Sequence, residues 1–430
     1  MRFQPILTST LLGSLIFSAA CERNLFQPKA EVPVSMRDTS AVRLNYRYEA
    51  DVPAPTIENT PRSDDDRNAG VQADFDANRT QELLDRTITS PDKKRVLAVY
   101  RRVTDLPAEV RLDMYSADGK ILRKVTADAM AAHFPDTTAW SPDSRTVAFV
   151  ASSRTVGLTQ PAITPPLPTP DANNTDANTT PVATPTLAAP TPAAPTGILT
   201  FRTEQIYICD AEGAGLKALT QNEGLIYFYY VWSPDSTVLA ALAATSREWR
   251  YQEIESDSKG EQIVPKGRLR IIEKNGRERR LDDNLTAARP VWSPDSAKIA
   301  VPFDTQIRIY DGGGNSPTQA AIPLRNQLLI SSQTYDRDQQ RKLQASNASA
   351  DPNAANTPPT PDEPLTTLPD EKLLVSYNPI VEVAWTADDL IYLKTAYLRR
   401  MKNDADSVTS FARWHRLALS PQITAPVKSK

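Results

Sequence analysis

Short runs of hydrophobic and β-branched residues, each bounded by turn residues, recur from about residue 85 to residue 420. Most runs span four to eight residues, which is the length of strands rather than of helices. The clearest runs follow the sequence Trp-Ser-Pro-Asp-Ser, called the turn phrase below, at residues 140–144, 232–236 and 292–296. Degenerate copies lie at 90–93 and 385–389. The pattern predicts a chain built mainly of β-strands.

The chemistry of the turn phrase is structural. Proline fixes φ at the second position of a β-turn, and Ser and Asp side chains bond nearby backbone amides. We expect the preceding Trp to fill the space between neighbouring sheets. Five equivalent copies argue against a catalytic role for these Ser and Asp residues.

A second pattern alternates with the first. A strand leads into an Asp-Gly or Asn-Gly type of turn at 112–119, 206–213, 269–276 and 307–313. Such turns join antiparallel strands in hairpins. Once two low-complexity insertions are subtracted, the repeat length is about 50 residues. Each repeat therefore predicts a unit of four strands, A to D, which is the blade of a β-propeller.

These two patterns resemble the TolB-type, WD40-like (PD40) propeller repeat over most of residues 85–420. The resemblance implies an all-β propeller of five or six four-stranded blades, expected at 81–420. It implies no particular function, because this repeat occurs in many unrelated exported proteins. TolB also carries an N-terminal α/β domain. The residues here before the first repeat are too few and too polar for that domain, so the partners of TolB are not carried over.

Segments outside the repeats differ in composition. The alternating residues 41–50 form a candidate strand, expected to complete the last blade and close the ring. Residues 51–80 are acidic and polar, and we expect them to be disordered. Residues 155–197 form a Pro/Thr-rich insertion of extended, polyproline-like character. Residues 333–370 form a second low-complexity insertion, whose first part, 335–344, is compatible with a short helix.

The N-terminus resembles a bacterial lipoprotein signal. The apolar run 6–20 is too short for a membrane span, and small residues lead directly to Cys21. We expect residues 1–20 to be removed, Cys21 to be lipidated and residues 21–40 to act as a tether. Ser18 stands where a Leu-like residue is usual. The alternative is therefore ordinary secretion, with an unmodified Cys21 and a soluble secreted or periplasmic product.

Composition excludes several classes of function. The formal charge of −3 argues against a nucleic-acid partner, which requires a basic surplus. Two Cys exclude a disulfide scaffold, and two His disfavour a His-rich metal site. The sequence contains no nucleophile elbow, zinc-binding helix, P-loop or dinucleotide fingerprint. We therefore expect no catalytic residue, no metal and no cofactor.

Long connections gather on one side of the expected blades, where the B–C and D–A loops lie. Long loops on a rigid scaffold are common sites of function. Two of them carry Trp, Tyr and Arg, the residue types enriched at interface hot spots. The candidate binding residues are Arg247, Trp249, Arg250, Tyr251, Arg399 and Arg400. The alternative is that Trp249 packs beneath its own loop and the arginines are solvated.

These observations predict an exported, lipid-anchored propeller on the cell-surface or periplasmic side of a membrane. Its expected role is to bind a protein or a cell-envelope polymer through the long-loop face. The first alternative is a hydrolase or lyase that acts on glycans in the central funnel. The second is a structural or sensor ectodomain. Converging acids with perturbed pKa values at the funnel would favour the enzyme.

Overall fold

The computed structural model describes residues 35–56, 67–104, 106, 109–153, 203–314, 316–350, 379–399, 402–403 and 408–422. The expected signal peptide 1–20, Cys21 and the Pro/Thr-rich insertion lie outside these residues, as does Arg400. None of the helices in the described part of the chain is long and apolar enough to cross a membrane.

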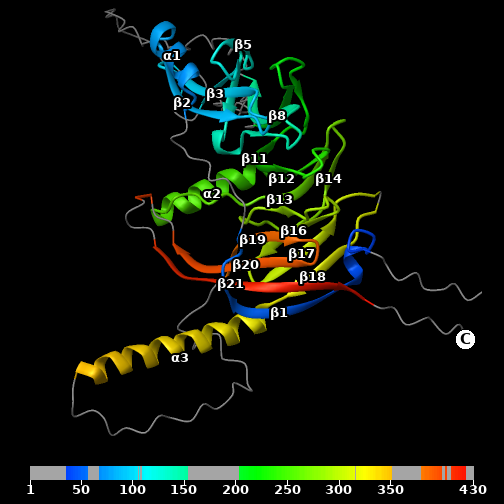
Figure 1. The fold of residues 1–430 in the computed structure, drawn as a ribbon, viewed down its shortest axis with the longest axis vertical. Helices are drawn as coiled ribbons and strands as arrows, with labels where there is room; N and C mark the ends of the chain where they lie inside the picture. The colour runs from blue at the N-terminus through cyan, green and yellow to red at the C-terminus, as the bar shows by residue number, and fades with distance from the viewer. Residues whose placement is uncertain are drawn as a thin grey trace, which may run out of the picture.

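The described residues form five antiparallel sheets, numbered I to V here, that follow one another along the chain (Figure 1). Sheet I contains β2 (Glu82–Thr89), β3 (Arg95–Arg102), β4 (Arg111–Ser116) and β5 (Ile121–Lys124). Sheet II contains β6 (Met130–His133), β7 (Ala139–Trp140), β8 (Thr146–Ser153), β9 (Gln205–Asp210) and β10 (Lys217–Ala218). β6 and β7 both pair with β8, so they occupy a single position in the sheet.

The other three sheets repeat this arrangement. Sheet III contains β11 (Leu225–Trp232), β12 (Val238–Thr245), β13 (Arg268–Glu273) and β14 (Glu278–Arg280). Sheet IV contains β15 (Val291–Trp292), β16 (Lys298–Phe303), β17 (Gln306–Asp311) and β18 (Gln319–Pro323). Sheet V contains β19 (Ile380–Ala387), β20 (Leu390–Arg399), β21 (Val408–Pro421) and the N-terminal strand β1 (Leu44–Val52). The four-stranded repeating unit expected from the sequence is therefore present.

The turn phrase links each sheet to its neighbour as well as forming a turn. Within the phrase, the Ser141 hydroxyl bonds the Asp143 carboxylate at 2.5 Å and accepts from the Thr146 amide at 3.0 Å. The Asp143 amide then donates to the hydroxyl of Ser236, in the phrase of the next sheet, at 3.0 Å. Equivalent bonds join Asp92 to Ser144, and Asp235 to Ser296.

The Trp of the phrase adds a second link between sheets. Its indole N–H donates to a backbone carbonyl of the preceding sheet, from Trp140 to Ile88 at 3.1 Å and from Trp292 to Val231 at 3.3 Å. The degenerate copy in Sheet V differs, because Trp385 bonds the carbonyl of Asp388 in its own turn. Sheets I to IV therefore share a regular connection. Sheet V is joined to Sheet IV by apolar packing and by other bonds, such as the one from the Ile380 amide to the Asp304 carbonyl at 2.9 Å.

The core lies between successive sheets. Buried side chains fill the spaces between Sheets I and II, II and III, III and IV, and IV and V. At the far end, Leu417 and Leu419 of β21 pack with Ile307 and Ile309 of β17. The sheets are thus stacked face to face in chain order, and each buries apolar surface against its neighbours.

The expected disorder across residues 51–80 needs correction, because α1 (Ala69–Asn78) lies within it. Asn68 caps this helix by accepting a hydrogen bond from the Val71 amide at 3.0 Å. Val71 and Phe75, one turn apart, are buried against Sheet I in a cluster that includes Tyr100. The cap and these two apolar residues explain the helix in an otherwise polar segment.

The second low-complexity insertion, expected at 333–370, begins within a helix that starts before it. Helix α3 (Arg325–Ala350) starts directly after β18, before residue 333, and is longer than the expected helix 335–344. Its first turn is held by Leu328 and Leu329, which are both buried. Leu328 extends the packing between Sheets IV and V into the helix. Residues 351–370 of the insertion lie outside the described part of the chain.

The N-terminal strand joins the last sheet. A short 3₁₀ segment, η1 (Ala41–Arg43), precedes β1, which pairs antiparallel with β21 from Leu44 opposite Pro421 to Glu49 opposite Arg416. The described residues form no closed ring, however. Sheet I and Sheet V lie at opposite ends of the molecule, and α1 packs on Sheet I (Figure 1). The face on which another sheet would close the ring is therefore already occupied.

Candidate functional site

Helix α2 (Ser246–Lys259) occupies the connection between β12 and β13, where the sequence predicts a long loop. Thr245 starts the helix with a capping box: its hydroxyl accepts from the Glu248 amide at 3.2 Å, and the Glu248 carboxylate accepts from the Thr245 amide at 3.0 Å. Gly260 ends the helix with a φ of 66°, in the left-handed region that glycine adopts without strain.

Trp249 lies on the inner side of α2. It is 5% exposed, and its ring packs between Phe134 at 5.6 Å and Phe228 at 5.5 Å, measured between ring centroids. Its indole N–H donates to Glu253 at 2.8 Å. This position corrects the choice of Trp249 as a candidate binding residue and agrees with the alternative, in which it packs beneath its own connection and holds the helix on Sheets II and III.

Three further contacts fix α2 in place. Arg268 of β13 forms an ion pair with Glu248 at 2.6 Å. Burial alone would raise the pKa of the Glu248 carboxyl, but hydrogen bonds from Thr245 and Arg268 hold it below its usual value. The Gln252 amide donates to the carbonyl of Lys266 and accepts from its amide, at 3.1 and 2.6 Å. The helix is therefore a fixed part of Sheet III.

The other basic region named from the sequence lies beside α2. Lys402, in the connection between β20 and β21, forms an ion pair with Asp257 at 2.9 Å, and its amide bonds the carbonyl of Gly260. The fold thus brings together two connections far apart in the sequence. Arg399 ends β20, but its side chain and the whole of Arg400 lie outside what the structure describes.

The outer side of α2 carries the remaining candidates. Arg247, Arg250, Tyr251 and Ile254 are exposed and follow the spacing that places side chains on one side of a helix. Tyr251 is 67% exposed and Ile254 is 54% exposed. The guanidinium of Arg250 pairs with Glu253 at 3.2 Å. Three of the residues named from the sequence therefore share one exposed surface.

A cavity of about 470 Å³ opens beside this surface, between α2 and the connection from β14 to β15. Its lining includes Arg247, Glu248, Tyr251, Gln252 and Leu285. Sequence reasoning did not single out Leu285, which is 37% exposed and comes from a short D–A connection. Its place at the cavity depends on how the connection from Sheet III to Sheet IV packs against α2, which no local sequence pattern reveals.

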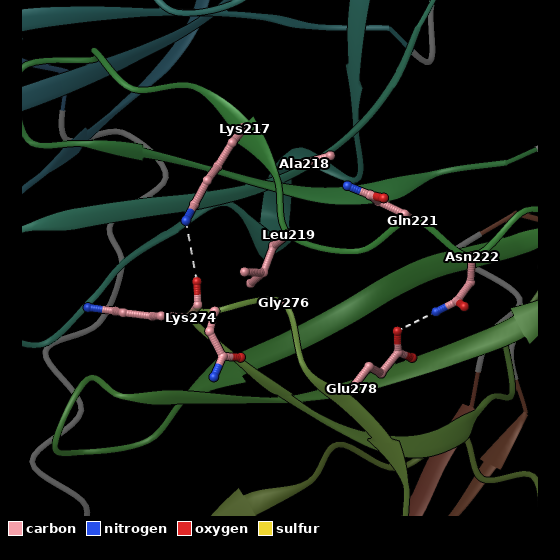
Figure 2. Close-up of a pocket in the computed structure, with 9 residues that line it drawn as sticks. Lys217, Ala218, Leu219, Gln221, Asn222, Lys274, Gly276 and Glu278 are labelled. Carbon is pink, nitrogen blue, oxygen red and sulfur yellow. Dashed lines mark hydrogen bonds between the residues drawn. The ribbon is translucent and has the colours of Figure 1, made fainter.

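A second cavity, of about 390 Å³, lies at the junction of Sheets II and III near the turn between β13 and β14 (Figure 2). Because β13 runs from α2 to this turn, the two cavities lie at opposite ends of the strand. Lys217 donates to the carbonyl of Lys274 at 3.4 Å. Glu278 accepts from the Tyr227 hydroxyl at 2.7 Å and from Arg270 at 2.6 Å. Its carboxylate is thus satisfied within the fold.

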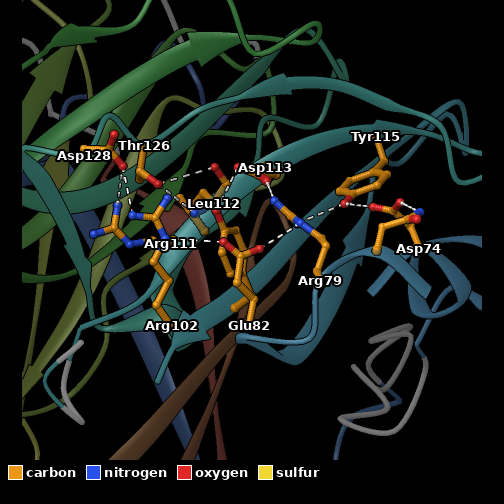
Figure 3. Close-up of polar contacts among 12 residues, drawn as sticks. Asp74, Arg79, Glu82, Arg102, Arg111, Leu112, Asp113, Tyr115, Thr126 and Asp128 are labelled. Atoms are coloured by element: carbon orange, nitrogen blue, oxygen red, sulfur yellow. Dashed lines mark hydrogen bonds and ion pairs between the residues drawn. The ribbon is translucent and has the colours of Figure 1, made fainter. Parts of the chain in front are cut away.

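A polar network connects α1 to Sheet I (Figure 3). Arg79 forms ion pairs with the buried Asp113 of β4 and with Glu82, the latter at 2.8 Å. The hydroxyl of Tyr115 donates to Asp74 of α1 at 2.7 Å. Burial raises the pKa of the Asp113 carboxyl, against the opposing effect of the Arg79 charge. Since these groups pair with one another, the network fastens the helix to Sheet I.

Both histidines bond hydroxyl groups within the fold. His415 is buried, and its ring nitrogens bond the hydroxyls of Tyr48 at 2.9 Å and Thr395 at 3.0 Å. Burial, with a smaller contribution from Arg413, lowers the pKa of His415 to about 4. His133 bonds the hydroxyl of Ser152 at 2.8 Å.

Two further observations concern candidate chemistry. Cys209 lies buried on β9, and burial raises the pKa of its thiol to about 12. Within the described ranges, no group of three or more His, Cys, Asp or Glu side chains is arranged to hold a metal ion.

No family model and no curated protein matches the sequence. Solved structures that are similar include an oligogalacturonate lyase in complex with manganese, with 14% identity, a TM-score of 0.28, and coverage of 55% of this chain and 47% of that one. A protein described as TolB, from Agrobacterium tumefaciens, has 14% identity, a TM-score of 0.26, and coverage of 56% and 69%. Prolyl oligopeptidase B from Galerina marginata has 9% identity, a TM-score of 0.37, and coverage of 79% and 36%.

The lyase and the TolB protein are β-propellers, the fold class that the repeat resembles. This chain spans 47% of the lyase and 36% of the prolyl oligopeptidase. At such low identities and TM-scores, these likenesses carry no argument about the activity, substrate or partners of this chain.

Proposed function

We propose that the five sheets are propeller-type blades arranged in an open series, and that the protein is an exported, lipid-anchored binding module. Its binding surface is the exposed side of α2 together with Lys402, which pairs with Asp257 of the helix. Its partner is a protein or a cell-envelope polymer. The observation that carries the proposal is a helix fixed to the sheets while its outer side presents Arg247, Tyr251 and Ile254 to solvent.

A helix that is already held in place favours binding through its exposed side chains. A partner that docks on α2 loses little affinity to ordering of the helix, because the capping box, the Trp249 packing and the Glu248–Arg268 pair already hold it. Exposed Tyr and Ile side chains supply apolar area, and Tyr and Arg are frequent in interface hot spots. A binding role is also consistent with the internal pairing of Asp113, Glu278 and His415.

The proposed anchor is a lipid on Cys21. The chain enters the sheets at Ala41, whose amide donates to Asp311 of Sheet IV at 2.9 Å. Residues 35–40 already form turns against the sheets, where Thr39 is buried and Met36 packs on the core between Sheets IV and V. About 14 residues lead from Cys21 to Ser35, and at roughly 3.4 Å per extended residue they could span up to about 48 Å. Such a tether would hold the module near a membrane while leaving α2 free to meet its partner.

Affinity capture from the native envelope tests the proposal. Tyr251→Ala with Ile254→Ala should reduce recovery of a stoichiometric partner at least tenfold. The matched control is Ile121→Ala with Leu122→Ala on β5, which also removes two exposed apolar side chains, each 40% exposed. Equal recovery with both double variants would reject the α2 surface. An N-terminal peptide without acyl mass on Cys21 would reject the lipid anchor.

A further inference from the structure

The charged side chains of α2 are almost all neutralised within the fold. Glu248 pairs with Arg268, and Arg250 with Glu253. Glu255 pairs with Lys259 at 2.6 Å, and Asp257 with Lys402 at 2.9 Å. Arg247 is different, because it is exposed and forms no hydrogen bond or ion pair with any described residue. The helix thus presents one uncompensated positive charge.

This charge lies at the rim of an apolar space. Arg247 lines the 470 Å³ cavity beside α2, whose lining is largely apolar and includes Tyr251 and Leu285. The polar groups of Glu248 and Gln252 also reach the cavity, but they are engaged by Arg268 and by the backbone of Lys266. A ligand therefore meets a free guanidinium next to apolar walls, and few other free polar groups.

We propose that the cavity binds a segment of a partner protein that carries a carboxylate next to an apolar side chain. The carboxylate would accept the two parallel hydrogen bonds that a guanidinium donates, and the apolar side chain would lie between Tyr251 and Leu285. The inference rests on the proposed function and specifies its partner class. A polysaccharide fits the cavity less well, because sugar hydroxyls need several directed polar partners and those present are already bonded.

A displayed library of random 12-residue peptides, selected on the full-length mature protein, tests this inference. We expect the enriched peptides to share an Asp or Glu beside Leu, Ile or Phe. Arg247→Glu should weaken these peptides at least tenfold in calorimetric titration, and a new selection on that variant should enrich Lys or Arg instead. Because Arg247 is exposed and pairs with no residue that the structure describes, its replacement should leave the melting temperature unchanged.

Arg123→Glu on β5 is the matched control, since it makes the same charge change at an exposed arginine that pairs with no described residue and lies on Sheet I, away from α2. It should change peptide affinity by less than about threefold. Enriched peptides without a shared acid, or equal binding to the wild type and Arg247→Glu, would overturn the inference. An envelope partner captured through α2 that proves to be a polysaccharide would also overturn it, while leaving the proposed function intact.

Discussion

At the scale of single residues, burial separates aromatic side chains that look equivalent in the sequence. Trp249 and Tyr251 are two positions apart, in a segment that reads as one polar, aromatic stretch. The helix turns Trp249 into the contact with Phe134 and Phe228 and leaves Tyr251 in solvent. The sequence names both residues as candidates, but only the helical geometry assigns one to packing and the other to the surface.

Replacement of Trp249 should therefore affect stability far more than replacement of Tyr251. Trp249→Ala should lower the free energy of unfolding by about 3 kcal/mol, because it empties a buried aromatic site. Tyr251→Ala should change it by less than about 0.5 kcal/mol, as is usual for exposed positions. Urea denaturation measures both values. An unchanged midpoint for Trp249→Ala would contradict the packing role.

The buried His415 predicts a dependence of stability on pH. Its pKa is about 4 in the folded protein and about 6.5 when unfolded, so the unfolded chain binds the proton more readily. Stability from this residue is fully present above pH 6.5 and is lost as the pH falls towards 4, by up to about 3 kcal/mol. His415→Gln should reduce the difference between unfolding free energies at pH 7 and pH 4.5. An equal difference between the two pH values in His415→Gln and in the wild type would contradict the lowered pKa of His415.

At the scale of elements, the turn phrase predicts much of the architecture. Its strands, its turns and the role of its Trp between sheets follow from residue chemistry. The bond from Asp143 to Ser236 does not, because it joins residues 93 positions apart whose proximity depends on how sheets stack. Helix α1 does not follow from the sequence for a different reason: Val71 and Phe75 alone give too weak a helical periodicity to be recognised in an acidic segment.

The link between sheets can be tested at Ser236. Ser236→Ala removes the acceptor for the Asp143 amide and should lower unfolding free energy by about 1 kcal/mol. Lys93→Ala is the matched control, because Lys93 occupies the same place in the first copy, with a φ of 61° against 64°, and no such hydroxyl. Its effect should stay below about 0.5 kcal/mol. Equal losses would assign the Ser236 effect to backbone strain rather than to the bond.

At the scale of the whole molecule, the repeat predicts the unit but not how the series ends. The resemblance led to the expectation of a closed ring, whereas α1 covers the free side of Sheet I and β1 completes Sheet V at the other end. Both outcomes depend on segments that lie outside the repeat. The candidate surface could not be predicted from the sequence for a similar reason. Lys402 and α2 are far apart in the sequence and meet only in the folded chain.

The covering role of α1 predicts an effect on assembly. Val71→Asp places a charge in the buried contact with Sheet I and should release the helix, exposing the apolar surface around Tyr100. We expect self-association in light scattering after size-exclusion chromatography. Ala73→Asp makes a similar change at an exposed position of the same helix and should remain like the wild type. A monomeric Val71→Asp protein with intact stability would contradict this role.

The central claim is that the protein is a tethered module that binds through α2. Crosslinking with mass spectrometry on the native envelope tests it most directly, because it reports the N-terminal modification and the contact surface together. We predict an acylated Cys21 and partner crosslinks at and beside α2, with Lys259 of the helix, Lys266 between α2 and β13, and Lys402 as reactive amines. An unmodified Cys21, with crosslinks concentrated on Sheet I, would contradict the account.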